Sequence, residues 1–259
     1  GAADLLGKYT ALSDWILARE LIGEYYCPDI ADLVRRVTDD CARDPVSLRE
    51  RRDAAVANLT EGLILSGIGI LMVGNSRPAS GSEHHLSHFW EMKEQLQGEG
   101  EHLHGEKVAV GSLLAARAYQ FLLGQDLEKL SYHSRWRTLG LSWEEYSREL
   151  EKTYGPLVEE LPIMKAEPPK AEPLPAEFSE KLANGLSQIR VRPPALQTIE
   201  ESLYQVGAPV GYQDLELPKA WVREALLYGR EVRERYTIFT LLAQLGLLSQ
   251  AADEILESC

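Results

Sequence analysis

Residues Gly74–Gly111, GNSRPASGSEHHLSHFWEMKEQLQGEGEHLHGEKVAVG, hold five of the six histidines of the chain. His84 and His88 are four residues apart, so they share one face of the helix that is expected to follow Ser82. His104 comes after a short polar insert and directly before a second helical pattern. The stretch predicts a helix–loop–helix unit that gathers imidazole side chains, which are the commonest metal ligands in proteins.

Helical periodicity continues on both sides of this stretch. Apolar residues recur at helical spacing near both ends of the chain, in the stripes Leu5, Tyr9, Leu12, Ile16 and Val232, Tyr236, Phe239, Ala243. The second stripe predicts one last long helix. No run of alternating strands and no glycine-rich turn after a strand is found, which argues against a nucleotide-binding βαβ unit. The sequence predicts an all-α helical bundle.

Composition and charge exclude some classes of function. The chain has 259 residues, of which 44% are hydrophobic, and this is enough to bury a core. A formal net charge of -13 argues against a nucleic-acid partner, which normally requires a basic face. Three widely spaced cysteines favour free thiols in a reducing compartment, and no signal peptide is visible, so we expect a cytoplasmic protein.

The most apolar segment is Leu63–Val73, which carries Gly67 and Gly69. It contains too few residues to cross a bilayer, so no membrane association is expected. We predict a buried helix whose glycines allow close packing.

A proline-rich polar segment, MKAEPPKAEPLP at Met164–Pro175, predicts an extended connector. It divides the chain into a helical domain at 1–162, a connector at 163–176 and a C-terminal helical region at 177–259. We expect the last region to pack on the same domain.

The histidines suggest a metal site whose members remain open at this point. A catalytic divalent ion typically has three protein ligands, and His84 and His104 are the best two candidates. His88 would be a ligand or a nearby polar group. The third ligand would be a carboxylate, and spacing leaves four open: Asp4, Asp14, Glu83 and Glu91. The alternative is that these histidines are ordinary core and surface residues.

The loop Asn75–Ser82, NSRPASGS, leads into a helix start. Its backbone N–H groups, together with Arg77, are suited to binding an anion such as phosphate. The alternative is a capped turn between helices, which these residues alone favour.

Three phrases resemble a known family. They are SGxxxxxxGxSRPASGSEHxxSH at Ser66–His88, HGEKVAVG at His104–Gly111, and the opening ADLLGKYTALSDW. Together they resemble the sn-glycerol-1-phosphate dehydrogenases, within the superfamily of iron-containing alcohol dehydrogenases, glycerol dehydrogenases and dehydroquinate synthases. The similarity covers most of Gly1–Gly124, and the region after Leu161 matches only in being helical.

The resemblance implies a two-domain enzyme. An N-terminal α/β domain would bind NAD(H) or NADP(H), and an all-helical C-terminal domain would supply the metal site. This chain would be the C-terminal domain alone, so no cofactor-binding residue is assigned to it. The absent nucleotide-binding domain is an expected partner, and the isolated chain is expected to be inactive.

The metal ligands implied by the resemblance are Asp4, His84 and His104. His88 matches a catalytic histidine beside the substrate and the nicotinamide. Lys8 stands where iron-dependent relatives place a further histidine ligand, which implies a three-ligand site for zinc, with nickel or iron as alternatives.

The implied reaction is the reversible reduction of dihydroxyacetone phosphate to sn-glycerol 1-phosphate, in the context of phospholipid metabolism. Lys8, Arg77, Ser80 and Ser82 are the predicted substrate-binding residues. The surface toward the absent domain is expected to be apolar, which would allow a homo-oligomer. The alternatives are a glycerol or polyol dehydrogenase and a non-catalytic helical metal-binding or assembly module.

Overall fold

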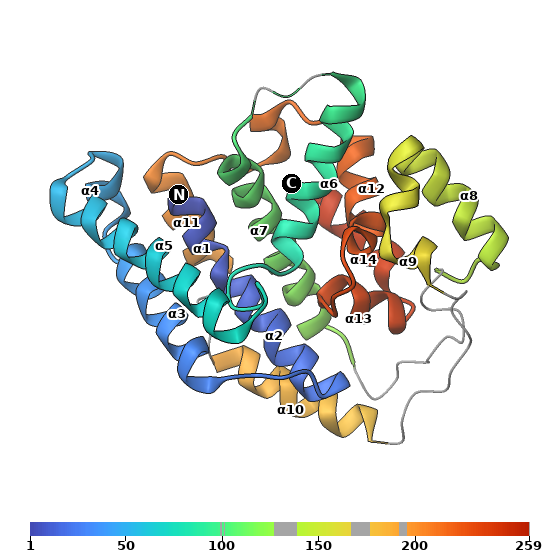
Figure 1. Ribbon diagram of the computed structural model, residues 1–259, viewed down its shortest axis with the longest axis horizontal. Helices are drawn as coiled ribbons and strands as arrows, with labels where there is room; N and C mark the ends of the chain where they lie inside the picture. Colours follow the sequence, from blue (N-terminus) through green and yellow to red (C-terminus); the bar gives the residue numbers. More distant parts are fainter. Residues whose placement is uncertain (99, 101, 127–138, 167–176, 192–195, 259) are drawn as a thin grey trace.

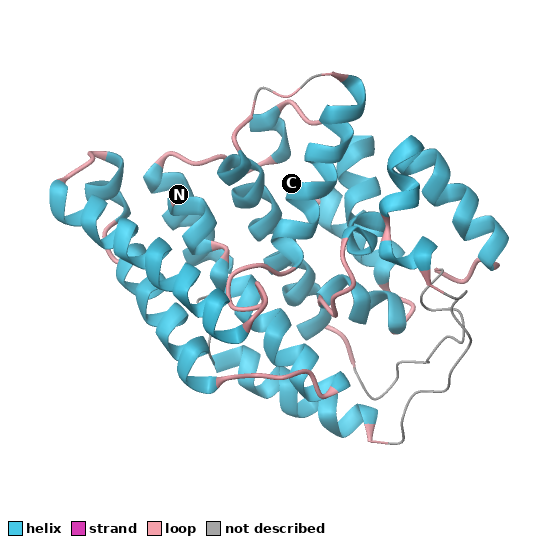
Figure 2. Ribbon diagram, in the orientation of Figure 1, coloured by secondary structure: helices cyan, strands magenta, loops and turns pink. Residues whose placement is uncertain are grey.

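The computed structural model describes residues 1–98, 100, 102–126, 139–166, 177–191 and 196–258. Within these ranges every regular element is a helix (Figure 2), which confirms the predicted all-α class. The α-helices are α1 (Ala2–Leu6), α2 (Lys8–Ile22), α3 (Pro28–Ala42), α4 (Pro45–Arg49), α5 (Asp53–Val73), α6 (Ser82–Gln97), α7 (His104–Leu123), α8 (Trp143–Tyr154), α9 (Pro162–Lys165), α10 (Phe178–Val191), α11 (Leu196–Val206), α12 (Lys219–Tyr228), α13 (Ile238–Gln244) and α14 (Leu248–Glu257). The 3₁₀ helices are η3 (Gly155–Glu160), η4 (Tyr212–Leu215) and η5 (Gly229–Val232).

Helices α6 and α7 form the centre of the molecule and pack extensively on each other (Figure 1). The largest buried apolar cluster joins them to α2, α8, α10 and the C-terminal helices. Phe89 of α6, for example, meets the ring of Tyr154 of α8 edge-on, with 5.3 Å between ring centroids. Burial of such apolar and aromatic surface is the main force that holds helices together.

Two glycines allow α6 to approach its neighbours unusually closely. A Cβ atom on Gly111 of α7 would lie 2.5 Å from the carbonyl oxygen of Glu83, and one on Gly81 would lie 2.8 Å from Cα of Ala11 in α2. Only glycine fits where backbones come this close. The first turn of α6 is therefore wedged between α2 and α7, and this turn carries His84.

The prediction that Leu63–Val73 is buried is wrong. Helix α5 packs against α3 through small residues such as Gly69, which faces Ile30, and several of its large side chains are exposed. Leu71 is 80% exposed and Met72 is 67% exposed. Periodicity failed here because the buried positions of α5 are glycine and serine, which hydropathy patterns do not mark as core-facing.

The length of α5 also differs from the sequence expectation. The helix has 21 residues, and among the described residues it alone is long and apolar enough to cross a membrane by length and composition. The segment Leu63–Val73, on which the prediction against a membrane rests, is only the C-terminal part of this helix.

The predicted last long helix is wrong as well. Helix α13 begins only at Ile238, after a segment that starts with extended backbone at Arg233. Two buried side chains bind this segment: Arg77 donates to the carbonyl of Tyr236, and Asp14 accepts from the amide of Ile238. These bonds take backbone groups that a continuous helix would use itself.

The predicted connector lies largely outside the described residues, which omit 167–176. Its first residues belong to α9. Beyond it, α10 packs against α2, and α11 packs against α4 and α7.

Candidate metal centre

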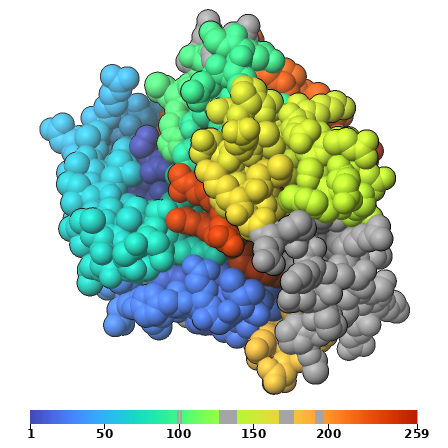
Figure 3. Space-filling view, turned by 45° about the vertical axis from the view of Figure 1, so that its right-hand side comes forward, coloured from blue at the N-terminus to red at the C-terminus, as the bar shows by residue number. Residues whose placement is uncertain are grey.

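Helices α1, α6 and α7 bring one carboxylate and three imidazoles together. The ring centroids of His84 and His104 are 5.2 Å apart, and His88 lies 5.9 Å from His84 and 5.5 Å from His104. Asp4, on the first turn of α1, faces His84 with 3.2 Å between Oδ1 and Nε2. Space-filling atoms of the N-terminal residues, dark blue in Figure 3, lie recessed between the teal α5 region and the green residues beside it.

The structure brings together the three residues that the resemblance implies as metal ligands. One ligand atom from each of Asp4, His84 and His104 lies within 4.8 Å of the others. A second group that meets the same criterion consists of His88, Glu91 and His104.

Glu83 orients His84 from behind. Its carboxylate lies 2.8 Å from Nδ1 of His84 and also accepts hydrogen bonds from the amide of Gly81 and the hydroxyl of Thr10. Glu83 is fully buried, so these partners fix its position. With Glu83 bound at Nδ1, Nε2 is the ring nitrogen of His84 that faces Asp4 and would bind a metal ion, which is the usual arrangement of a metal-ligating histidine.

Glu91 plays the same part for the other two rings. Its carboxylate lies 2.7 Å from Nδ1 of His104 and 2.9 Å from Nδ1 of His88. Nδ1 of His104 is therefore satisfied by a carboxylate. The Nε2 of His88 is engaged differently, because Nη2 of Arg233 lies 3.2 Å from it. Arginine can only donate, so this nitrogen accepts. Nε2 of His88 is therefore already hydrogen-bonded to an arginine, whereas Nε2 of His84 faces the carboxylate of Asp4.

The electrostatics keep the carboxylates charged. Burial alone would raise the pKa of Asp4, but the hydrogen bond with His84 and the charge of Lys8 outweigh it and hold that pKa well below its ordinary value. Burial likewise opposes the lowered pKa of Glu91, where the hydrogen bonds from His104 and His88 prevail. An ionised carboxylate is the form that binds a cation.

The donor set fits a divalent metal ion. Two imidazoles and one carboxylate are the composition of many three-ligand zinc sites, and nickel and iron accept the same donors. One observation supports a metal site here. Nδ1 of His84 is bound to Glu83, and the second ring nitrogen, Nε2, faces Oδ1 of Asp4 at 3.2 Å.

The predicted substrate-binding cations have internal partners. Lys8 is buried, lies 3.2 Å from Asp4 Oδ2 and donates to the carbonyl of Ala79 at 2.8 Å. Arg77 is buried as well and forms a two-point ion pair with Glu24. Both side chains thus support the walls of the site.

The loop before α6 is a capped turn in this structure. The amide of Ser82 donates to Asp14 at 2.6 Å, and the amide of Gly81 donates to Glu83 at 2.8 Å. Carboxylates of the chain itself therefore hold the N–H groups that a bound phosphate would need. The hydroxyls of Ser80 and Ser82 are buried and have no hydrogen-bond partner among the described residues.

Sequence reasoning missed the supporting partners. Spacing leaves Glu83 and Glu91 open as metal ligands, whereas in the structure both carboxylates bind Nδ1 atoms of histidines. The spacing of His88 and Glu91 on one helical face could have shown that they meet. No local pattern could have found Arg233, which lies 145 residues from His88.

The fold and the site define an all-helical protein that carries the donor set of a divalent-metal centre. No protein-family model matches the chain. Curated proteins do: it is 32% identical to glycerol-1-phosphate dehydrogenase (NAD(P)+) of Bacillus licheniformis over 96% of the chain and 49% of that relative. It is 29% identical to the protein of the same name from Halalkalibacterium halodurans over 93% of the chain and 51% of the relative.

Over nearly its whole length the chain is therefore a homologue of the glycerol-1-phosphate dehydrogenases, as its motifs predicted. A shorter match of 119 residues reaches 40% identity with the enzyme of that name from Staphylothermus marinus, covering 46% of the chain and 32% of the relative. The chain spans about half the length of the relatives that match it end to end.

Proposed function

We propose that this chain is the metal-binding part of an NAD(P)-dependent enzyme that interconverts dihydroxyacetone phosphate and sn-glycerol 1-phosphate. The observation that carries the proposal is the cluster of Asp4, His84 and His104, with Glu83 held on Nδ1 of His84. Its relatives are named glycerol-1-phosphate dehydrogenases, which supports the substrate and the nicotinamide cofactor.

Asp4, His84 and His104 would hold the metal ion, and zinc is the ion we propose. When bound, such an ion polarises a carbonyl and stabilises negative charge on its oxygen. Glu83 and Glu91 keep the imidazole rings in orientation from the far side, because each carboxylate accepts at Nδ1.

His88 is the residue we propose for proton handling. Reduction of a ketone adds a hydride to carbon and a proton to oxygen, and NAD(P)H supplies only the hydride. Nδ1 of His88 is bound to Glu91, so Nε2 is the atom that can hold the proton. In this structure Arg233 donates a hydrogen bond to that nitrogen, and this hydrogen bond must break when substrate enters.

Several further expectations belong to this proposal. The nucleotide-binding part of the enzyme would lie outside this chain, so the isolated chain would not oxidise NAD(P)H. A cytoplasmic location, a homo-oligomer and a role in phospholipid metabolism are also proposed.

Metal analysis tests the central claim. The purified chain should bind about one equivalent of zinc, and the double variant Asp4→Ala, His84→Ala should bind none. His102→Ala is the matched control, because His102 lies in the same stretch but outside both candidate ligand groups. Equal zinc uptake by the wild type and the double variant would leave a non-catalytic helical module as the better interpretation.

The substrate class is tested with the nucleotide-binding part supplied. NAD(P)H oxidation should require dihydroxyacetone phosphate and should be far slower with unphosphorylated dihydroxyacetone. Preference for the unphosphorylated compound would favour the polyol dehydrogenase alternative.

A further inference from the structure

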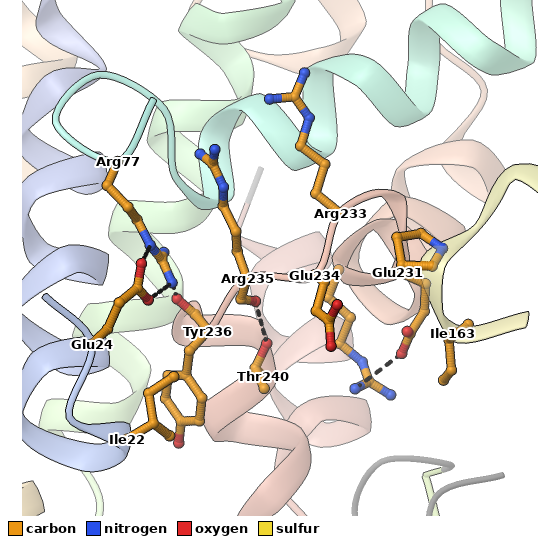
Figure 4. A pocket seen from close by; sticks show the side chains of 12 residues that line it. Ile22, Glu24, Arg77, Ile163, Glu231, Arg233, Glu234, Arg235, Tyr236 and Thr240 are labelled. Carbon is orange, nitrogen blue, oxygen red and sulfur yellow. Dashed lines mark hydrogen bonds and ion pairs between the residues drawn. The ribbon is translucent and has the colours of Figure 1, made fainter. Parts of the chain in front are cut away.

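A cavity of about 400 Å³ lies along the segment that follows η5, and its lining includes four arginines: Arg77, Arg230, Arg233 and Arg235 (Figure 4). Two of these charges are compensated within the wall. Arg77 pairs with Glu24, and Arg230 pairs with Glu231.

The guanidinium groups of Arg233 and Arg235 have no carboxylate within ion-pair distance among the described residues. In this they differ from Arg77 and Arg230. Figure 4 shows the side chains of Arg233 and Arg235 on the side of α6, while Glu234 points the other way. Arg235 donates to the carbonyl of Ser80 at 3.0 Å and to the hydroxyl of Ser76 at 2.7 Å. Each guanidinium has five N–H donors, so donors remain on both residues.

A buried polar atom at the same place also lacks a partner. The hydroxyl of Ser80 has no hydrogen bond among the described residues, and Ser80 is only 5% exposed. Its own carbonyl is the acceptor for Arg235, so the unpartnered hydroxyl belongs to the residue that this guanidinium contacts. An unpartnered buried hydroxyl next to uncompensated guanidinium groups is typical of a site for an anion with several acceptor oxygens.

The charge environment points in the same direction. Burial, together with the like charges of Arg77 and Arg233, lowers the pKa of Arg235 to about 10. Burial disfavours any charge, but the like charges of Arg77 and Arg233 contribute a positive potential that favours an anion.

We propose that Arg233 and Arg235 bind the phosphate group of the substrate, at the place where their guanidinium groups meet His88 of α6 and the loop before α6. This inference rests on the proposed function for the identity of the phosphate ester. Arg233 contacts His88, so a phosphate held there places a three-carbon chain beside the histidine cluster. The two arginines take the role that the sequence assigned to Lys8 and Arg77, whose charges are paired inside the protein.

The test is calorimetric titration of the metal-free chain with inorganic phosphate, sn-glycerol 1-phosphate and glycerol. The wild type should bind both phosphate compounds and not glycerol. Arg233→Gln and Arg235→Gln should each weaken phosphate binding by about tenfold or more, since each removes charge-assisted hydrogen bonds. Arg233→Lys, which keeps the charge, should retain part of the affinity.

Arg43→Gln is the control, because it removes one positive charge from an exposed pair with Asp40 at the end of α3. Zinc uptake by every variant should equal that of the wild type, which separates this proposal from the metal-site proposal. Three results would overturn it: no phosphate binding by the wild type, unchanged binding by both glutamine variants, or equal loss in Arg43→Gln. None of them would affect zinc binding through Asp4, His84 and His104.

Discussion

Oε1 of the fully buried Glu83 lies 2.8 Å from Nδ1 of His84, its neighbour in sequence. Adjacent residues on a helix normally point about 100° apart. The contact forms because the Glu83 side chain turns back to the amide of Gly81, ahead of the helix, at 2.8 Å. A helix-start interaction thus serves a second purpose as the outer support of a metal ligand.

Glu83→Gln should weaken zinc binding by about 10–100-fold, because Nδ1 of His84 loses a charged acceptor. Competition with a coloured chelator measures the affinity. Glu94→Gln is the matched control, since Glu94 is also buried on α6 but pairs with Lys107 at 2.5 Å. If both variants lost the same affinity, the effect would come from general destabilisation of α6.

The stability gained from zinc should increase with pH. Burial alone would lower the pKa of His84, but its hydrogen bonds to Asp4 and Glu83 raise it above 6.5. In the metal-free chain the raised pKa contributes stability below pH 6.5, and this is lost as pH rises through the folded-state pKa. The metal replaces that proton, so its binding is favoured as the proton leaves.

Thermal unfolding with and without zinc checks this. The zinc-induced rise in melting temperature should be larger at about pH 8 than at about pH 6, and His84→Ala should abolish it at both. A larger rise at the lower pH would contradict the assignment of His84 as a ligand.

Asp14→Asn should destabilise the chain by about 3 kcal/mol or more. Asp14 accepts from the hydroxyl of Tyr119 and the amides of Ile238 and Ser82, at 2.7, 2.8 and 2.6 Å. Asparagine has one acceptor oxygen and turns an amide N–H₂ toward donors. Urea unfolding measures the loss, and the exposed Asp29→Asn should change the unfolding free energy little.

Gly111→Ala and Gly67→Ala should have opposite effects. A Cβ on Gly111 meets the carbonyl oxygen of Glu83 at 2.5 Å, so α6 and α7 must separate. Gly67, on the exposed α5, has no atom within 4 Å of its Cβ position. Alanine there should stabilise the helix by about 0.5–1 kcal/mol. Chemical unfolding and zinc titration of both variants measure the free energy of unfolding and the zinc affinity. If Gly111→Ala changed neither quantity, the close approach of α6 and α7 would be refuted.

Leu71→Gln with Met72→Gln should reduce binding of an apolar fluorescent dye. These side chains are 80% and 67% exposed on α5 and form part of an apolar stripe facing solvent. Because neither is buried, the unfolding free energy should change by less than about 0.5 kcal/mol. Unchanged dye fluorescence would place the apolar binding surface elsewhere.

The sequence predicted features that depend on neighbours along the chain. The all-α class follows from periodicity, and the meeting of His84 with His88 follows from helical spacing. The choice of Asp4 among the four open carboxylates came from the resemblance, because nothing local connects it to residues 80 positions away. The exposure of α5 and the break before α13 depend on what packs against each segment. The contact of Arg233 with His88 is unpredictable for the same reason, because the two residues are 145 positions apart and only tertiary packing brings them together.

Backbone contact between α6 and α7 also determines how the site fails. Because Gly111 places peptide against peptide, no rotatable side chain lies between the two helices at Glu83 that could yield gradually. Heating should loosen the periphery first, while the spacing of His84 and His104 stays constant until the two helices part. Loss of the metal on heating should therefore be abrupt. A partly open site with intermediate metal affinity should not be populated.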